Sequence, residues 1–162
     1  MADTKEQFEA VIRLCREIYE RKLEDYGPSW RIMRPESITD QILIKAKRIR
    51  SLEIKKVRRI DEGIKPEFIG IVNDGMIGLL QLDLGFSDNT DMTSAEALRL
   101  YDRYMTDTKE IMHAKNYDYD EAWRLMRISS YTEMILTKLN RIKEIEKYEG
   151  KVYVSEGIDS NY

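Results

Sequence analysis

Apolar residues recur every three or four positions along most of this chain, which is the spacing of one face of an α-helix. The first such face carries Phe8, Ile12, Cys15 and Tyr19. A nearly continuous apolar segment follows Pro66, and its length predicts a buried central helix. The predicted helices run from Thr4 to about Glu24, from near Ser37 or Thr39 to about Arg59, from Lys65 to Leu82, from Thr93 to about Lys115, and from Ser130 to about Tyr148.

Polar residues mark the ends of these helices. Thr4 with Gln7, and Thr93 with Glu96, have the spacing of a capping box, in which two side chains satisfy backbone N–H groups at a helix start. Gly27-Pro28 and Gly63 are expected to break the chain between helices. Beyond Gly150 the sequence predicts a turn and a short extended piece at 152–154.

The same pattern occurs twice. Residues 21–53 and 114–146 align at an offset of 93 without a gap, and the only two tryptophans of the chain, Trp30 and Trp123, fall on matching positions. One residue further out of register, Glu62-Gly63-Ile64 matches Glu156-Gly157-Ile158. A fixed period of this kind indicates a duplicated structural unit.

The duplication predicts an all-α helical bundle built from two tandem homologous halves with pseudo-two-fold symmetry. We expect a single domain over 1–162, with repeat 1 at about 5–82 and repeat 2 at about 93–162. The second repeat ends where its last helix should begin, so it is expected to lack that helix. An exposed apolar groove, or a neighbouring chain that fills it, is expected in that place.

Composition narrows the class of protein. The chain has 162 residues, 35% of them charged, and a net charge of −3, which argues against general binding to nucleic acids. One cysteine and one histidine, His113, leave no Cys-rich or His-rich metal site. No apolar run approaches the roughly 18 residues of a membrane span, and the amino terminus does not resemble a signal peptide. The cytoplasm is the expected location.

Cations interrupt the apolar stripe of the second helix in each half. Lys45 and Lys138 lie within the stripes, and Arg48 and Arg141 follow one turn later. Because an unpaired buried charge is costly, we expect both lysines to lie mostly out of solvent beside carboxylates of the duplicated set. Those carboxylates are Asp25, Asp118, Glu62 and Glu156. The alternative is a purely structural salt-bridge network.

A loop with the pattern Asp-Tyr-x3-Trp precedes each of these helices. It could simply cap the end of the bundle. Aromatic rings also stack on bases, carboxylates hold Mg²⁺, and Lys and Arg neutralise phosphates, so the duplicated set contains the elements of a nucleotide site. The predicted nucleotide-binding residues are Tyr26, Trp30, Lys45, Arg48, Tyr119, Trp123, Lys138 and Arg141.

The segments KNYDYDEAW, ILTKLNRI and SEGIDSNY resemble the nucleotide-modification-associated type 1 domain family of bacteria and phages. The family loop reads K-N-x-D-Y-G, and each copy here departs from it once, with Leu23 in place of Asn and Asp120 in place of Gly. The family is distantly similar to the all-α nucleotide pyrophosphatases of the MazG type. That similarity implies helix-borne carboxylates that bind Mg²⁺ and activate water.

Three functions remain open. In the first, the resemblance implies a Mg²⁺-dependent nucleotide pyrophosphohydrolase, with the catalytic residues Asp118, Glu156, Asp25 and Glu62, and with the same four plus Asp74 as metal ligands. The second is a non-catalytic module that binds nucleotides. The third is a structural or assembly domain with a buried salt-bridge network. The expected partner is a nucleotide, with a homo-oligomer as a further open alternative.

Overall fold

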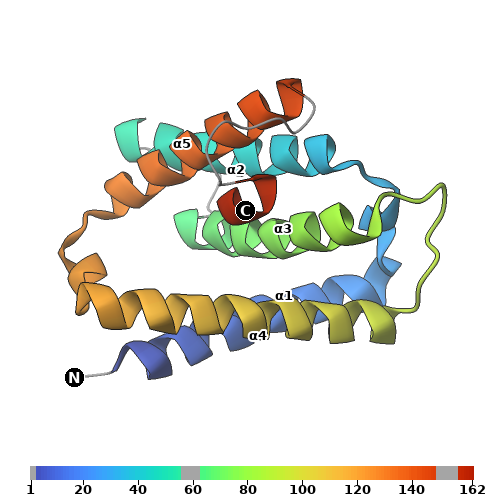
Figure 1. Cartoon of the computed structure of the whole chain (residues 1–162), viewed down its shortest axis with the longest axis horizontal. Helices are drawn as coiled ribbons and strands as arrows, with labels where there is room; N and C mark the ends of the chain where they lie inside the picture. Colours follow the sequence, from blue (N-terminus) through green and yellow to red (C-terminus); the bar gives the residue numbers. More distant parts are fainter. Residues whose placement is uncertain (1–2, 56–62, 149–156) are drawn as a thin grey trace. The chain divides into compact units, whose positions relative to one another are not determined.

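The computed structural model describes residues 3–55, 63–148 and 157–162, and these residues contain helices and no strand. This confirms the all-α fold class. No described helix combines the length and the apolar character needed to cross a membrane. The elements, shown in Figure 1, are α1 (Thr4–Tyr26), the 3-10 helix η1 (Ser29–Ile32), α2 (Pro35–Lys55), α3 (Ile64–Leu84), α4 (Ser94–Tyr119), the 3-10 helix η2 (Ala122–Leu125), α5 (Ile128–Lys147) and α6 (Ile158–Asn161).

Helix starts follow the local capping chemistry. Thr93 caps α4, and its side chain accepts a hydrogen bond from the backbone N–H of Glu96, as predicted. At α1 the prediction was wrong by one residue, because Asp3 is the cap and accepts from the N–H of Lys5. Helix α2 begins at Pro35, since proline fits the first turn of a helix, where no N–H is needed. The predicted extended piece at 152–154 lies outside the described residues.

The repeat is visible in the elements themselves. In each half a long helix ends, a short 3-10 helix follows, and a second long helix begins. The bounds keep the sequence offset of 93: Tyr26 with Tyr119, Ser29 with Ala122, Ile32 with Leu125, and Pro35 with Ile128. Helices α3 and α6 also begin at matching residues, Ile64 and Ile158. The two-fold axis between the halves stays a prediction.

The chain packs as two compact units. Unit 1 comprises Met1–Ile32 and Ser87–Met126 and contains α1, η1, α4 and η2. Unit 2 comprises Met33–Phe86 and Arg127–Tyr162 and contains α2, α3, α5 and α6. Each unit therefore combines matching elements from both halves of the repeat.

In unit 1 the antiparallel helices α1 and α4 run side by side (Figure 1). Their shared core contains Tyr19 and Tyr101, whose rings stack with centroids 4.3 Å apart. The Tyr19 hydroxyl donates to the carbonyl of Ala97 at 3.3 Å. Burial raises the pKa of both tyrosines and also that of the Cys15 thiol, which is 1% exposed.

In unit 2 helix α2 packs against both α3 and α5. The core where α2 meets α5 consists of apolar residues at helical spacing: Ile38, Ile42, Ala46, Leu136, Leu139 and Ile142. The short helix α6 lies against α5 and α3. This core positions the polar side chains beside it, among them Thr39, Glu146 and Tyr162, which are joined by hydrogen bonds.

The loop that follows α4 contains backbone in the left-handed region. Asp120 has φ 48° and Glu121 has φ 63°, whereas the residue that matches Asp120 in the first half is Gly27, with φ 65°. Only glycine adopts such angles without steric cost. We expect Asp120→Gly to raise the free energy of unfolding by about 0.5–1 kcal/mol, measured by urea denaturation.

The reverse change is the control. Gly27 combines its positive φ with ψ −171°, a region open almost only to glycine, so Gly27→Asp should cost about 1–3 kcal/mol. A destabilised Asp120→Gly protein would contradict this account of the loop.

Candidate functional site

The residues predicted to form a nucleotide site are divided between the two units. The acidic and aromatic members, Asp25, Tyr26, Trp30 and their counterparts, belong to unit 1. The basic members, Lys45, Arg48 and their counterparts, belong to unit 2 together with Asp74. Glu62 and Glu156 lie outside the described residues.

The first copy of the loop serves the core of unit 1. Trp30 is 7% exposed, and Arg31 beside it is 5% exposed. The Arg31 guanidinium donates to both carboxylate oxygens of Asp91, at 2.8 and 3.2 Å, and holds the pKa of that carboxyl below its usual range. Trp30 thus matches the capping interpretation, whereas Tyr26 lies exposed.

The second copy is more open and is organised by Glu121. This carboxylate accepts hydrogen bonds from Thr4, from Asn116 at 3.1 Å, and from the Trp123 and Arg124 side chains at 3.1 Å each. These donors, Thr4 foremost, lower the pKa of Glu121 to about 2. Trp123 is 40% exposed, and the Arg124 guanidinium lies over its ring. Tyr119 is exposed.

The predicted metal ligands do not converge among the described residues. Asp25 and Asp118 lie at opposite ends of the antiparallel α1–α4 pair. At 1.5 Å per helical residue they are roughly 30 Å apart. Asp74 is already held by Lys45. The described part of the chain contains no group of three acidic, histidine or cysteine residues that could hold a metal ion, so Asp25, Asp118 and Asp74 do not form a Mg²⁺ site among themselves.

The cations of the first copy are neutralised by acids of α3. Lys45 Nζ lies 2.7 Å from Asp74, and an Arg48 nitrogen lies 2.8 Å from Glu67. The Lys45 side chain is 25% exposed, which confirms that it lies mostly out of solvent beside an acid. The partner is Asp74, however, which was not among the acids expected to pair with it. Of those acids, Asp25 belongs to unit 1, and Glu62 lies outside the described residues. The Lys45 stem passes closely over Gly70, where a Cβ would lie 2.8 Å from its Cε.

The cations of the second copy are placed differently. Lys138 and Arg141 on α5 are both exposed, so the prediction that Lys138 is buried was wrong. The buried face of α5 is centred on Thr132, Leu136 and Leu139, which leaves Lys138 at its edge. Arg141 makes no ion pair with any described residue. The two copies of one sequence motif thus have different surroundings.

A cavity of about 270 Å³ lies beside Lys138, within unit 2. Its walls are mostly apolar and come from α2, α3, α5 and α6, including Ile71, Met134 and Ile135, with Tyr131 and Asn161 as further lining residues. The exposed groove predicted in the place of the missing last helix of the second repeat stays a prediction. The volume of the cavity is close to the lower end of the range for small-molecule sites, about 300–1,000 Å³.

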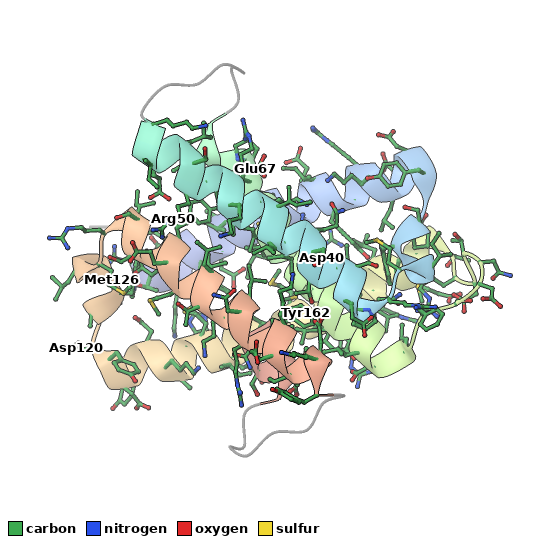
Figure 2. All side chains as sticks on the ribbon, turned by 90° about the horizontal axis from the view of Figure 1, so that it is seen from above. Asp40, Arg50, Glu67, Asp120, Met126 and Tyr162 are labelled. Carbon is green, nitrogen blue, oxygen red and sulfur yellow. The ribbon has the colours of Figure 1, made fainter. Side chains whose placement is uncertain are left out.

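Helix α6 closes one side of this cavity and is anchored by Tyr162, labelled in Figure 2. The Tyr162 hydroxyl lies 2.7 Å from the Thr39 hydroxyl and 3.1 Å from the carbonyl oxygen of Pro35. Its ring packs so closely on Gly78 that a Cβ there would lie 2.9 Å from the ring. Burial raises the pKa of Tyr162 to about 12.

The carboxylate of Glu146 completes this anchor. It accepts a hydrogen bond from the Thr39 hydroxyl at 2.7 Å. Its pKa is raised, first by burial and then by the nearby charges of Glu36 and Asp40. Because the folded state binds this proton more tightly than the unfolded state does, the contribution of Glu146 favours folding at low pH. That contribution is lost as the pH rises through the folded pKa.

We therefore expect Glu146→Gln to raise the free energy of unfolding at neutral pH and to leave it nearly unchanged below pH ~4, where glutamate is protonated even in the unfolded chain. Urea denaturation of both proteins over a pH series measures the difference. A gap between the two proteins that does not change with pH would contradict this role of the carboxylate.

Several residues that organise these sites were missed by the sequence prediction. Glu67, which pairs with Arg48, was not among the predicted residues, and Asp74 was predicted as a metal ligand but pairs with Lys45. The two acids are seven residues apart, which places them on one face of α3 and could have indicated that this face pairs with cations. Asp91 lies outside the repeat, and Glu121 matches Pro28 in the first half, so the duplication gave no signal for either.

Comparisons with known proteins identify one family. The family model described as nucleotide modification associated domain 1 matches residues 22–82 and 115–162, which together make up more than half of the chain. The two matched segments coincide with the two copies of the repeat. No curated protein and no solved structure matches the chain.

Proposed function

Because the chain belongs to the family of nucleotide modification associated domain 1, we propose that it binds a nucleotide, and that the site is the cavity of unit 2. The base lies between the apolar walls, and Lys138, with Arg141 one turn further along α5, holds the phosphate. One observation carries the proposal: an exposed cation lines an apolar cavity large enough for a small ligand.

The contrast between the copies supports this assignment. In the first copy Lys45 forms an ion pair with Asp74, and Arg48 forms one with Glu67, so these cations belong to a structural salt-bridge network. In the second copy both matching cations are exposed, and Lys138 lines the cavity. The structural function therefore applies to the first copy, and ligand binding to the second.

Hydrolysis of the nucleotide is not part of this proposal. The described acids do not form a Mg²⁺ site, and two of the predicted catalytic residues, Glu62 and Glu156, lie outside the described residues. A pyrophosphohydrolase stays a prediction that rests on the family resemblance. Pyrophosphate released from nucleoside triphosphates in the presence of Mg²⁺ is its direct measurement.

Lys138→Gln tests the proposed site. Isothermal titration calorimetry with the ribonucleoside and deoxyribonucleoside monophosphates of the common bases should show saturable binding that is stronger than that of the bare nucleosides. A hydrogen bond to a charged group contributes about 1.5–3 kcal/mol, so Lys138→Gln should weaken monophosphate binding by roughly 10-fold or more. Binding of the bare nucleoside should change little.

Lys143→Gln is the matched control. Lys143 lies on the same helix, loses the same charge, and pairs with Asp40 at 3.3 Å between exposed side chains. This variant should bind monophosphates as the unchanged protein does. Equal losses in the two variants would indicate a general charge effect, and no saturable binding of any monophosphate would overturn the proposal.

A further inference from the structure

One face of α5 supplies a large part of the wall of the cavity in unit 2. Tyr131, Met134, Ile135 and Lys138 all line the cavity, and a spacing of three, four and seven residues from Tyr131 places them on one face of the helix. Tyr131 lies at one end of this stripe and Lys138 at the other. An α-helix rises about 1.5 Å per residue, so the two positions are roughly 10 Å apart along the axis of α5. One ligand can therefore contact the aromatic ring at one end and the cation at the other.

The repeat shows how this stripe differs from its first copy. The residue that matches Tyr131 is Ile38, which is 2% exposed and belongs to the core where α2 meets α5. Met134 matches Gln41 and is 51% exposed. The second copy thus has an aromatic ring and a thioether where the first has an aliphatic and an amide side chain. Both replacements lie in the cavity wall and suit a flat apolar group.

Helix α3 contributes open space to the same cavity. Its lining residues are Ile71 and Gly75, which are one turn apart. Gly75 is buried, yet apart from its chain neighbours and the backbone of α3, a Cβ here would have only one described atom within 4 Å, the backbone oxygen of Tyr162 at 3.4 Å. Because glycine has no side chain, a planar ligand group can approach the backbone of α3 at this point.

We propose that the base of the nucleotide stacks on the ring of Tyr131 and uses the open space beside Gly75, while Lys138 holds the phosphate. This inference rests on the proposed function, since it requires a nucleotide in the cavity. Every base has an aromatic face, so the contact favours a nucleotide over a sugar phosphate and does not choose among the bases. The ligand then lies along α5, with its base near the start of the helix.

Tyr131→Ile tests the stacking contact with the residue that the first copy has at this position. Loss of one stacked base weakens binding by roughly 5- to 150-fold, and the variant should weaken each monophosphate that binds by such a factor in isothermal titration calorimetry. Tyr131→Phe keeps the ring and should recover the binding. Ribose 5-phosphate, which has the phosphate and no base, should bind the unchanged protein more weakly by a similar factor and should lose nothing further in Tyr131→Ile.

Proton NMR of the nucleotide gives a signal that a merely structural role of Tyr131 would not produce. Protons held over the face of an aromatic ring resonate upfield. The base protons should therefore shift upfield on binding to the unchanged protein and to Tyr131→Phe, and should shift much less in Tyr131→Ile at the same bound fraction. Equal shifts in all three proteins would show that the base does not stack on Tyr131.

Gly75→Ala tests the open space on the α3 side. Alanine favours a helix more than glycine does, so the fold should be kept, and the added methyl group should weaken monophosphate binding by roughly 5-fold or more. Gly70→Ala is the matched control, because Gly70 lies on the same helix without lining the cavity, and a Cβ there would meet the flexible stem of Lys45. This variant should bind monophosphates as the unchanged protein does. Equal binding by the two variants overturns the role of Gly75.

The remaining outcomes distinguish this inference from the proposed function. The stacking contact is overturned if Tyr131→Ile binds monophosphates as tightly as the unchanged protein, if it weakens ribose 5-phosphate to the same extent, or if Tyr131→Phe fails to recover binding. It is also overturned if ribose 5-phosphate binds the unchanged protein as tightly as the monophosphates do. Each of these results leaves the phosphate site at Lys138 standing. No saturable binding of any monophosphate to the unchanged protein overturns the site itself and the inference with it.

Discussion

Tyr101→Ala is expected to lower the free energy of unfolding by about 3–5 kcal/mol, the range for truncating a large buried aromatic side chain. Tyr101 is fully buried in the core of unit 1, where its ring stacks on that of Tyr19 at a centroid distance of 4.3 Å. Removing it leaves a cavity between α1 and α4 and deprives Tyr19 of its stacking partner. Urea denaturation followed by circular dichroism measures the loss.

Tyr117→Ala is the matched control for this prediction. Tyr117 lies on the same helix, α4, and is 86% exposed, so its replacement should change the free energy of unfolding by no more than about 0.5 kcal/mol. Similar effects of the two variants would mean that the stacked pair does not form the core of unit 1.

Ile142→Ala should have a comparable effect on unit 2, with a loss of about 2–5 kcal/mol. Ile142 is fully buried where α5 meets α2, in contact with the cluster that contains Ile38 and Ile42. It also lines the cavity, so the change enlarges the proposed ligand site. Denaturation measures the loss of stability, and nucleotide titration should show weaker binding because the cavity wall has moved away from the ligand.

Ile128→Ala, at the exposed start of α5, is the control and should cost no more than about 0.5 kcal/mol. A tolerated Ile142→Ala would contradict the packing of α5 on α2. If Ile142→Ala lowers the free energy of unfolding but leaves nucleotide binding unchanged, Ile142 belongs to the core of unit 2 and does not contact the ligand.

The sequence predicted the long helices well because their apolar stripes extend over many turns. It missed η1 and η2, since four residues are too few to show a period. It placed the start of α2 too late because Pro35 was taken as a residue before the helix, although proline fits the first turn. From the end of the first helix to the start of the second, the bounds of the two copies keep the offset of 93 that the sequence alignment has.

The site was predicted less completely, for a physical reason. Periodicity identifies the face of a helix on which a side chain lies, but neighbouring elements decide whether that face is covered. Lys45 is covered by α3 and paired with Asp74, as its position in the stripe implied. Lys138 has the same position in its own stripe and is exposed. Partners such as Asp91 come from packing between distant segments, which a local pattern does not encode.

The buried thiol of Cys15 can report the local unfolding of unit 1. It is the only cysteine of the chain, it is almost fully buried in unit 1, and its raised pKa keeps little of it as the reactive thiolate. An alkylating reagent can modify it only when unit 1 opens, so the labelling rate under native conditions follows that opening alone. A ligand bound in unit 2 can then be tested for communication with unit 1 without any engineered label.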